Sequence, residues 1–211
     1  MADSLETLKQ MIVDGDEGAT TQTETLLGEG TGAREILDAA LLPGMEEVGR
    51  RMKTGECFIP EVLLSAQIMQ ACLDLVKPHL AAGDSGTLAT VVIGTVEGDM
   101  HDIGKNLVAM LLAGAGFNVI NLGKGITPAD FVAAVKEHKP AILGMSGLLT
   151  TTIPKMPATI KALQEAGLRD QVKVIVGGAP VSKEYAMEVG ADAYGANAAM
   201  GVETCKALIG S

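Results

Sequence analysis

The sequence predicts an α/β protein in two parts, an N-terminal four-helix bundle followed by a five-stranded parallel sheet covered by helices. Two observations support this prediction. Through residue 82, apolar positions recur at helical spacing, whereas from residue 88 onward short apolar runs alternate with helical stretches. That alternation is typical of right-handed βαβ units, in which each helix returns the chain to begin a parallel neighbouring strand.

The four helices of the N-terminal part are separated by glycine and proline signals. In the first, apolar residues recur between Ser4, a candidate N-cap, and Gly15. The other three are expected over about residues 17–27, 33–55 and 58–76. Pro43 falls inside the third segment and must break or kink it, because proline cannot donate a backbone hydrogen bond.

A linker is expected between the two parts. Residues 81–86 (AAGDSG) are small and polar, which is typical of a connection rather than of packed structure. We therefore predict a helical domain at 1–82, a linker at 83–86 and a second domain at 87–211. In that domain we expect strands at 88–94, 117–122, 141–146, 172–176 and 191–194, and helices at 104–115, 127–137, 153–166, 181–188 and 197–209.

Composition excludes several classes of function. The formal net charge of −10 argues against binding to nucleic acid or anionic membranes, which requires clustered cations. The N-terminus lacks the basic and apolar regions of a secretory signal, and no apolar run approaches the roughly 18 residues of a spanning helix. The three cysteines, Cys57, Cys72 and Cys205, lack a CxxC spacing, as expected of reduced thiols in a cytoplasmic protein.

The loop between the first strand and its helix carries the most polar chemistry. It reads EGDMHDIGKN over residues 97–106 and contains His101, one of three histidines, between Asp99 and Asp102. Loops at the carboxyl ends of parallel strands are where open α/β sheets bind ligands. Taken alone, the loop also fits an ordinary helix start, since Asp and Asn are common caps and Gly104 could ease a turn.

Two further motifs follow later strands at defined distances. Ser146-Gly147-Leu148 follows the third apolar run, and Gly177-Gly178 follows the fourth. The combination Asp-x-His-x-x-Gly, Ser-x-Leu and Gly-Gly closely resembles the base-off, His-on cobalamin-binding domain. In addition, residues 43–62 (PGMEEVGRRMKTGECFIPEV) resemble the helical cap that precedes this domain in methionine synthase and in small corrinoid proteins. The length and two-part layout are similar to the corrinoid proteins of methanol, methylamine, betaine and aryl methyl ether methyltransferase systems.

The resemblance implies a flavodoxin-like (Rossmann-like) strand order, 2-1-3-4-5, and a set of ligand contacts. His101 would replace the cofactor's own benzimidazole as the lower axial ligand of cobalt, Asp99 would accept the other ring N–H, and Thr152 would extend this chain. Thr152 could equally be a simple helix cap. Gly104 would make room for the cofactor. The nucleotide base and tail would meet Ser146, Leu148, Thr150, Gly177 and Gly178. Further cofactor contacts would come from Gly98, Met100, Asp102, Ile103 and Ala198.

The helical part would cover the upper, methyl-bearing face of the cofactor. By the spacing of the cap motif, Met52 and Ile59 would lie over that face, and Asp38 would reach it from an earlier helix. Methionine can fill irregular gaps, as this role requires. Packing in the core of the bundle is the alternative for Met52 and Ile59.

The function that the resemblance implies is a methyl carrier. Cobalt as Co(I) would accept a methyl group from a substrate-specific methyltransferase, and methyl-Co(III) would deliver it to a second methyltransferase acting on a folate, pterin or thiol. A reductive activating protein would be a third partner. The chain would therefore not be a complete enzyme alone. The alternatives are a cobalamin-dependent sensor, a mutase cobalamin subunit and a receiver-like phosphoacceptor domain.

Overall fold

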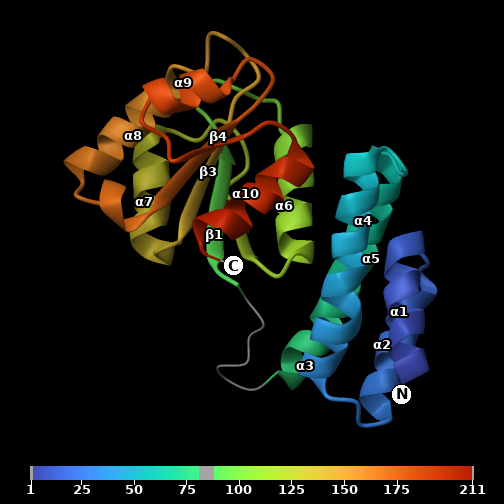
Figure 1. Cartoon of the computed structure of the whole chain (residues 1–211). Helices are drawn as coiled ribbons and strands as arrows, with labels where there is room; N and C mark the ends of the chain where they lie inside the picture. Colours follow the sequence, from blue (N-terminus) through green and yellow to red (C-terminus); the bar gives the residue numbers. More distant parts are fainter. Residues whose placement is uncertain (1, 81–87, 211) are drawn as a thin grey trace. The chain divides into compact units, whose positions relative to one another are not determined.

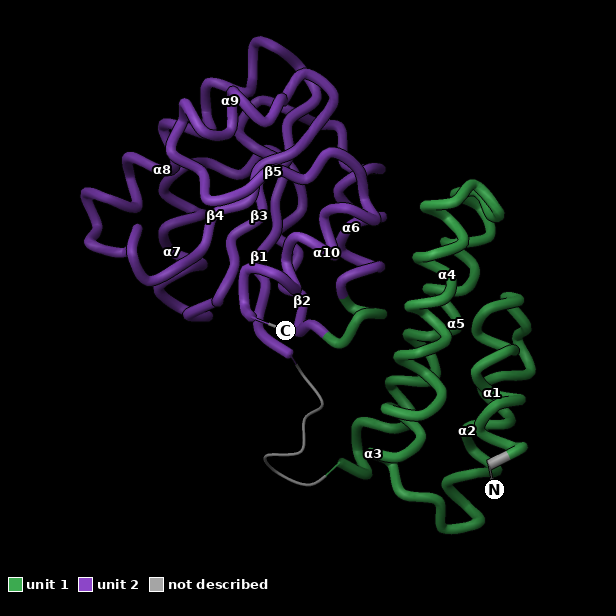
Figure 2. Tube along the Cα trace, viewed as in Figure 1, with its two compact units in different colours: residues 1–87, 113–116 green, residues 88–112, 117–211 purple. Residues whose placement is uncertain are grey.

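The computed structural model describes residues 2–80 and 88–210 (Figure 1). The chain divides into two compact units, one of residues 1–87 with 113–116 and the other of residues 88–112 with 117–211 (Figure 2). The predicted linker at 83–86 and its flanking boundaries lie outside the described residues, so the domain limits stay a prediction. We describe each unit by itself.

The helical unit contains the predicted four helical segments. They are α1 (Ala2–Asp14), α2 (Gly18–Gly28), a composite helix from Ala33 to Thr54, and α5 (Ile59–Val76) with a 3-10 turn, η2 (Lys77–His79). Ser4 lies inside α1 rather than capping it. Helix α1 packs against α4, and α2 packs against α5, around a core of aliphatic side chains and methionine.

The composite helix passes Pro43 without stopping. It consists of α3 (Ala33–Ile36), a π-helical segment η1 (Leu37–Leu41) and α4 (Leu42–Thr54). Leu42 N–H donates to the Leu37 carbonyl oxygen, five residues back, which is the π-helical spacing. The break that proline predicts is therefore replaced by a widened turn just before it, which accommodates the ring and its missing N–H.

The long helix α5 is the one helix among the described residues that is long and apolar enough to cross a membrane, judged by length and composition alone over Ile59–His79. Polar residues such as Glu61, Gln67 and Asp74 interrupt it, so it contains no continuous apolar run of the predicted length. The helix contacts α1, α2 and α4. Its buried residues are Val62, Ser65, Ala66, Ile68, Met69, Cys72, Leu73 and Val76. It is the core helix of the bundle.

The second unit is a parallel sheet of five strands. These are β1 (Thr90–Thr95), β2 (Asn118–Asn121), β3 (Ile142–Ser146), β4 (Lys173–Gly177) and β5 (Ala193–Gly195). The order is β2-β1-β3-β4-β5, which confirms the predicted order. The chain adds β2 on one side of β1 and then β3, β4 and β5 on the other side. The strand order therefore reverses beside β1, and such sheets bind ligands at this point.

Helices cover both faces of the sheet (Figure 1). They are α6 (Ile103–Gly114), α7 (Pro128–His138), α8 (Lys155–Glu165), α9 (Lys183–Glu188) and α10 (Ala198–Leu208). One core lies between the strands and α7, α8 and α9, with Phe131, Leu143 and Met156 among its fully buried members. Helices α6 and α10 lie together on the opposite face, where Gly201 approaches Val108.

The carboxyl ends of four strands lie side by side. Thr95 pairs with Ser146, Ser146 with Gly177, and Gly177 with Gly195. The loops that follow β1, β3 and β4 carry the three sequence motifs. The fold therefore brings the motifs to one edge of the sheet, as expected for a ligand site built from loops.

Candidate functional site

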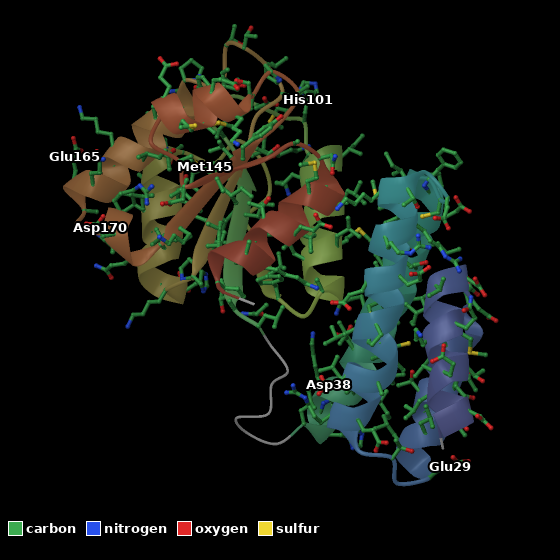
Figure 3. All side chains as sticks on the ribbon, in the orientation of Figure 1. Glu29, Asp38, His101, Met145, Glu165 and Asp170 are labelled. Carbon is green, nitrogen blue, oxygen red and sulfur yellow. The ribbon has the colours of Figure 1, made fainter. Side chains whose placement is uncertain are left out.

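The loop after β1 buries the Asp99 side chain. It presents His101 at the surface of the protein, where Figure 3 labels it. The Asp99 side chain is 0% exposed, whereas 53% of the His101 side chain is exposed. Gly98 has φ +80°, a conformation that favours glycine, and it turns the chain just before Asp99. The buried Thr95 hydroxyl donates to the His101 carbonyl oxygen over 3.2 Å and fixes the loop to the end of β1.

Asp99 fixes the tautomer of the His101 ring. Nδ1 of His101 lies 2.8 Å from Asp99 Oδ1. Burial raises the pKa of Asp99, but hydrogen bonds from the backbone N–H groups of His101 and Leu148, from Thr152 and from the His101 ring outweigh it, so the pKa lies well below its usual range. An ionised carboxylate only accepts, so Nδ1 carries the hydrogen, and in the neutral form of the ring the lone pair is on Nε2. Within the described part of the chain, Nε2 makes no hydrogen bond.

Asp99 also binds the loop after β3. Its Oδ2 accepts from Leu148 N–H at 2.7 Å, Leu149 N–H at 3.2 Å and the Thr152 hydroxyl at 2.8 Å. The predicted chain from His101 through Asp99 to Thr152 is therefore present. Thr152 does not cap α8, whose N-cap is Pro154. The hydroxyl also lies 2.9 Å from the Leu149 carbonyl oxygen, but its single proton favours the charged acceptor.

The glycines of the three motifs differ in whether a larger residue would fit there. A Cβ on Gly104 would meet no atom within 4 Å apart from its chain neighbours and the backbone of its own helix, so packing against the rest of the protein does not require glycine there. A Cβ on Gly178, where φ is +130°, would lie 1.9 Å from the Gly147 carbonyl oxygen. A Cβ on Gly177 would lie 2.9 Å from the Gly195 carbonyl oxygen. Backbone packing thus explains Gly177 and Gly178, while Gly104 leaves an open space that a bound ligand could use.

The remaining predicted contacts of the sheet unit gather around these loops. Met100, Ile103, Leu148 and Thr150 are exposed, Ile103 by 82%, and Ser146 and Asp102 are half-buried. Large exposed apolar side chains beside a ligand loop suit a mainly apolar partner surface. Ala198 differs, because it is only 8% exposed and Asn197 caps α10 by accepting from Met200 N–H at 2.9 Å. Little of Ala198 remains available to a ligand.

The predicted cap residues lie in the helical unit. Ile59 is 49% exposed at the start of α5, so the bundle-core alternative does not apply to it, and Met52 on α4 is half-buried. Asp38, in the π-helical segment, accepts from Arg34 Nε at 2.5 Å. Phe58, which precedes Ile59, is 70% exposed and was not among the predicted cap contacts. The feature of the sequence that could have drawn attention to Phe58 is its aromatic ring, since only 2% of the residues are aromatic.

Lys105, in the first turn of α6, was also missed. It is 2% exposed, and Nζ donates to the side-chain oxygens of Asn106 at 2.6 Å and Asn121 at 2.5 Å. Burial lowers the pKa of Lys105, and Asp102 partly offsets this. Asn121 also accepts from Gly123 N–H at 3.1 Å. The lysine therefore connects α6 with the loop after β2. Its position directly after Gly104 in the first motif is the feature of the sequence that could have drawn attention to it.

The donor set limits what metal the chain can hold. Over residues 2–80 and 88–210, no three His, Cys, Asp or Glu side chains are grouped as a metal site requires. A metal bound through His101 would therefore not be held by a cluster of these side chains in the described residues. A metal-containing macrocycle meets this condition, and the room at Gly104 and the exposed apolar side chains fit it.

Comparisons with known proteins agree with this arrangement. Two family models described as "B12 binding domain" match residues 89–203 and 4–77. Trimethylamine corrinoid protein 1 of Methanosarcina acetivorans is 41% identical over 204 residues, covering 95% of this chain and 94% of that protein. A crystal structure of a cobalamin-binding protein from Desulfitobacterium hafniense has a TM-score of 0.79 and 38% identity, covering 98% of each chain. The methanol:cobalamin methyltransferase complex of Methanosarcina barkeri contains a chain with a TM-score of 0.90 and 30% identity, covering 99% of this chain and 81% of that one. The chain therefore belongs to the B12-binding corrinoid proteins.

Proposed function

We propose that the chain is a corrinoid methyl carrier in which His101 Nε2 holds cobalt from below a base-off cobalamin. The observation that carries the proposal is the exposed imidazole whose Nδ1 is fixed by the buried, ionised Asp99. An imidazole in this tautomer presents one nitrogen lone pair in a fixed direction, as a metal ligand requires. When bound, the cobalt supplies the nucleophilic centre that carries the methyl group.

The residues of the sheet unit would bind and orient the cofactor. Asp99 keeps the ring of His101 in one tautomer and direction. Gly104 allows close approach at the start of α6, where a Cβ would meet no atom within 4 Å beyond its chain neighbours and its own helix backbone. Ser146, Leu148 and Thr150 would receive the nucleotide base, with the tail passing Gly177 and Gly178. That Met52, Ile59 and Asp38 cover the methyl-bearing face stays a prediction.

The names of the relatives suggest the partners. One relative is a trimethylamine corrinoid protein, and another lies in a complex with a methanol methyltransferase. We infer that a substrate-specific methyltransferase for a methylated amine or alcohol is the first partner. A second methyltransferase with a folate, pterin or thiol acceptor and a reductive activating protein would complete a cytoplasmic system.

The absorption spectrum of the reconstituted protein tests the ligand. Protein loaded with methylcobalamin is expected to show a histidine-ligated spectrum, and His101→Ala a base-off spectrum. His138→Ala is the matched control, since His138 lies at the end of α7 and pairs with Glu137 at 3.9 Å. A base-off spectrum for the unaltered protein, or an unchanged one for His101→Ala, would contradict the assignment.

Methyl transfer tests the carrier role. The reduced, loaded protein is mixed with a trimethylamine or methanol methyltransferase and its substrate, and formation of methylated corrinoid is followed by absorbance. Transfer that needs all three components is expected. If no methyltransferase of this class methylates the loaded protein although it binds cobalamin through His101, the carrier role fails and a sensor becomes the better hypothesis.

A further inference from the structure

Two buried charges of opposite sign lie in one short stretch of the chain. Among residues 2–80 and 88–210, the charged side chains that are buried are Asp99, 0% exposed, and Lys105, 2% exposed. His101 lies between them in the sequence. Their partners lie on opposite sides of β1, because Asp99 binds the loop after β3 whereas Lys105 binds Asn121 at the end of β2. The two charges therefore do not pair with each other.

The position of Lys105 is unfavourable for a charge. Nζ donates to two neutral oxygens, of Asn106 at 2.6 Å and Asn121 at 2.5 Å, and within the described residues it forms no ion pair. Burial lowers the pKa of Lys105, and the carboxylate of Asp102 offsets this only in part. The residue also lies in the first turn of α6, where the helix dipole favours anions. A neutral donor could bind the same amides without these costs, so the charge itself points to a use.

We propose that Lys105 supplies a fixed positive charge that stabilises Co(I) relative to Co(II) in the bound corrinoid. The inference rests on the proposed function, because it takes His101 as the cobalt ligand. Reduction of Co(II) by one electron from a low-potential reductant adds negative charge at the cobalt, which a nearby cation favours. The buried anion of Asp99 acts in the opposite direction, and Lys105 offsets it.

The size of the effect follows from the spacing of the two residues. His101 and Lys105 are four residues apart, so their Cα atoms lie within about 14 Å of each other. At a separation of this order and an effective dielectric constant of about 20, one unit charge changes the ratio of Co(I) to Co(II) by about fivefold to tenfold. A charge at the exposed surface would be screened by water and salt and would have a smaller effect.

A redox titration of the cob(II)alamin-loaded protein is the first test. Titanium(III) citrate is the reductant, and Co(II) and Co(I) are followed by absorbance. In Lys105→Gln the ratio of Co(I) to Co(II) at a fixed potential should fall about fivefold to tenfold, where tenfold corresponds to about 59 mV. Lys105→Arg should retain most of the ratio. Lys124→Gln is the matched control and should leave the ratio nearly unchanged, because Lys124 is exposed in the loop after β2. An unchanged ratio in Lys105→Gln would overturn the proposal.

A second variant keeps the lysine and guards against a Lys105→Gln protein that fails to fold. In Asn121→Asp a carboxylate replaces the amide that Nζ binds, and it neutralises the charge. The ratio should fall as in Lys105→Gln. Asn118→Asp is the matched control, because the Asn118 side chain is exposed and donates to the Thr90 hydroxyl at 3.3 Å. An unchanged ratio in Asn121→Asp, or an equal fall in both variants, would overturn the role of Lys105.

A background without the ligand separates the charge from any effect on ligation. When His101→Ala is combined with Lys105→Gln, the ratio should fall, relative to His101→Ala alone, by about the same factor as in the unaltered protein. Loss of the effect in this background would mean that Lys105 only positions His101, which would overturn the proposal and leave His101 as the ligand. An absorption spectrum that His101→Ala does not change would instead overturn the proposed function.

Discussion

Two glycines near the proposed cofactor differ in what a side chain there would meet. At Gly104 a Cβ would meet no atom within 4 Å beyond its chain neighbours and its own helix backbone, whereas at Gly178 a Cβ would overlap the Gly147 carbonyl oxygen at 1.9 Å. Both belong to the motifs that the sequence singled out. The structure separates them into one glycine that a ligand can explain and one that the fold requires.

The first prediction follows from this contrast. In the corrinoid-free protein, Gly104→Ala should leave the free energy of unfolding unchanged or raise it by up to about 1 kcal/mol, because alanine favours the helix. Gly178→Ala should lower it by about 3 kcal/mol or more through overlap and backbone strain. Urea unfolding measures both. Gly104→Ala should also lose at least about tenfold in cobalamin affinity, and unchanged affinity would show that the cofactor does not approach Gly104 closely.

Lys105 gives a second prediction at the same scale. Its buried ammonium is held by amide oxygens, and a carboxylate at position 121 would supply a charge-assisted hydrogen bond. Asn121→Asp should raise the free energy of unfolding of the corrinoid-free protein by about 1 kcal/mol, and so raise its thermal midpoint. Asn118→Asp, on the same strand, is the control, because the Asn118 side chain is exposed and donates to the Thr90 hydroxyl at 3.3 Å rather than accepting from Lys105. A lower midpoint for Asn121→Asp would contradict this prediction and would mean that the lost hydrogen bond from Asn121 Nδ2 to Asn106 Oδ1, at 3.0 Å, outweighs the added charge.

At the scale of elements, an ion-pair cluster holds the turn between α4 and α5. Arg50 binds Glu47 at 2.7 Å and Glu56 at 2.9 Å, and the Thr54 hydroxyl donates to Glu56 at 2.6 Å. The exposed Phe58 and Ile59 follow this turn directly. The cluster therefore fixes the segment that carries the predicted cap contact.

The third prediction concerns the charge of this turn. Hydrogen bonding to Arg50 is the largest cause that lowers the pKa of Glu47 and of Glu56, each to about 2. Because the folded pKa lies below the ordinary 4.5, the stabilisation is complete above about pH 4.5 and is lost as the pH falls toward 2. Carboxyl carbon shifts measure both values directly. In Arg50→Gln both should move toward 4.5, and salt should have the same effect because the groups are exposed. If the pKa values of Glu47 and Glu56 stay near 2 in this variant, Arg50 is not the cause of their lowering.

The sequence predicted the elements better than the contacts between them. The strands were found because runs such as Thr90–Thr95 are apolar and β-branched, and their order came from the resemblance rather than from any pattern. The π-helical segment before Pro43 was not predictable, since it depends on which carbonyl the Leu42 N–H reaches. His101, Asp99 and Thr152 were found by their side chains. The Leu148 and Leu149 N–H groups were missed because backbone donors leave no mark in a sequence.

At the scale of the whole molecule, His101 is the protein ligand proposed for cobalt, in place of a cage of side chains. This excludes a grouped His, Cys, Asp or Glu site across the described parts, 2–80 and 88–210. The fourth prediction compares two samples after desalting. Corrinoid-free protein mixed with a cobalt(II) salt should contain almost no cobalt, whereas protein mixed with cobalamin should retain about one cobalt per protein molecule. Atomic absorption measures both. Equimolar cobalt from the salt alone would reveal a protein-only site.

The central claim is that a protein histidine, and not the cofactor's own base, coordinates the cobalt. Its most direct measurement is the electron paramagnetic resonance spectrum of the cob(II)alamin-loaded protein grown with ¹⁵N-histidine, with unlabelled cofactor. A nitrogen ligand from His101 predicts that each cobalt line splits into a doublet, which His101→Ala abolishes and His138→Ala leaves intact. A triplet in the labelled protein would show that the unlabelled base is bound, and would contradict the account.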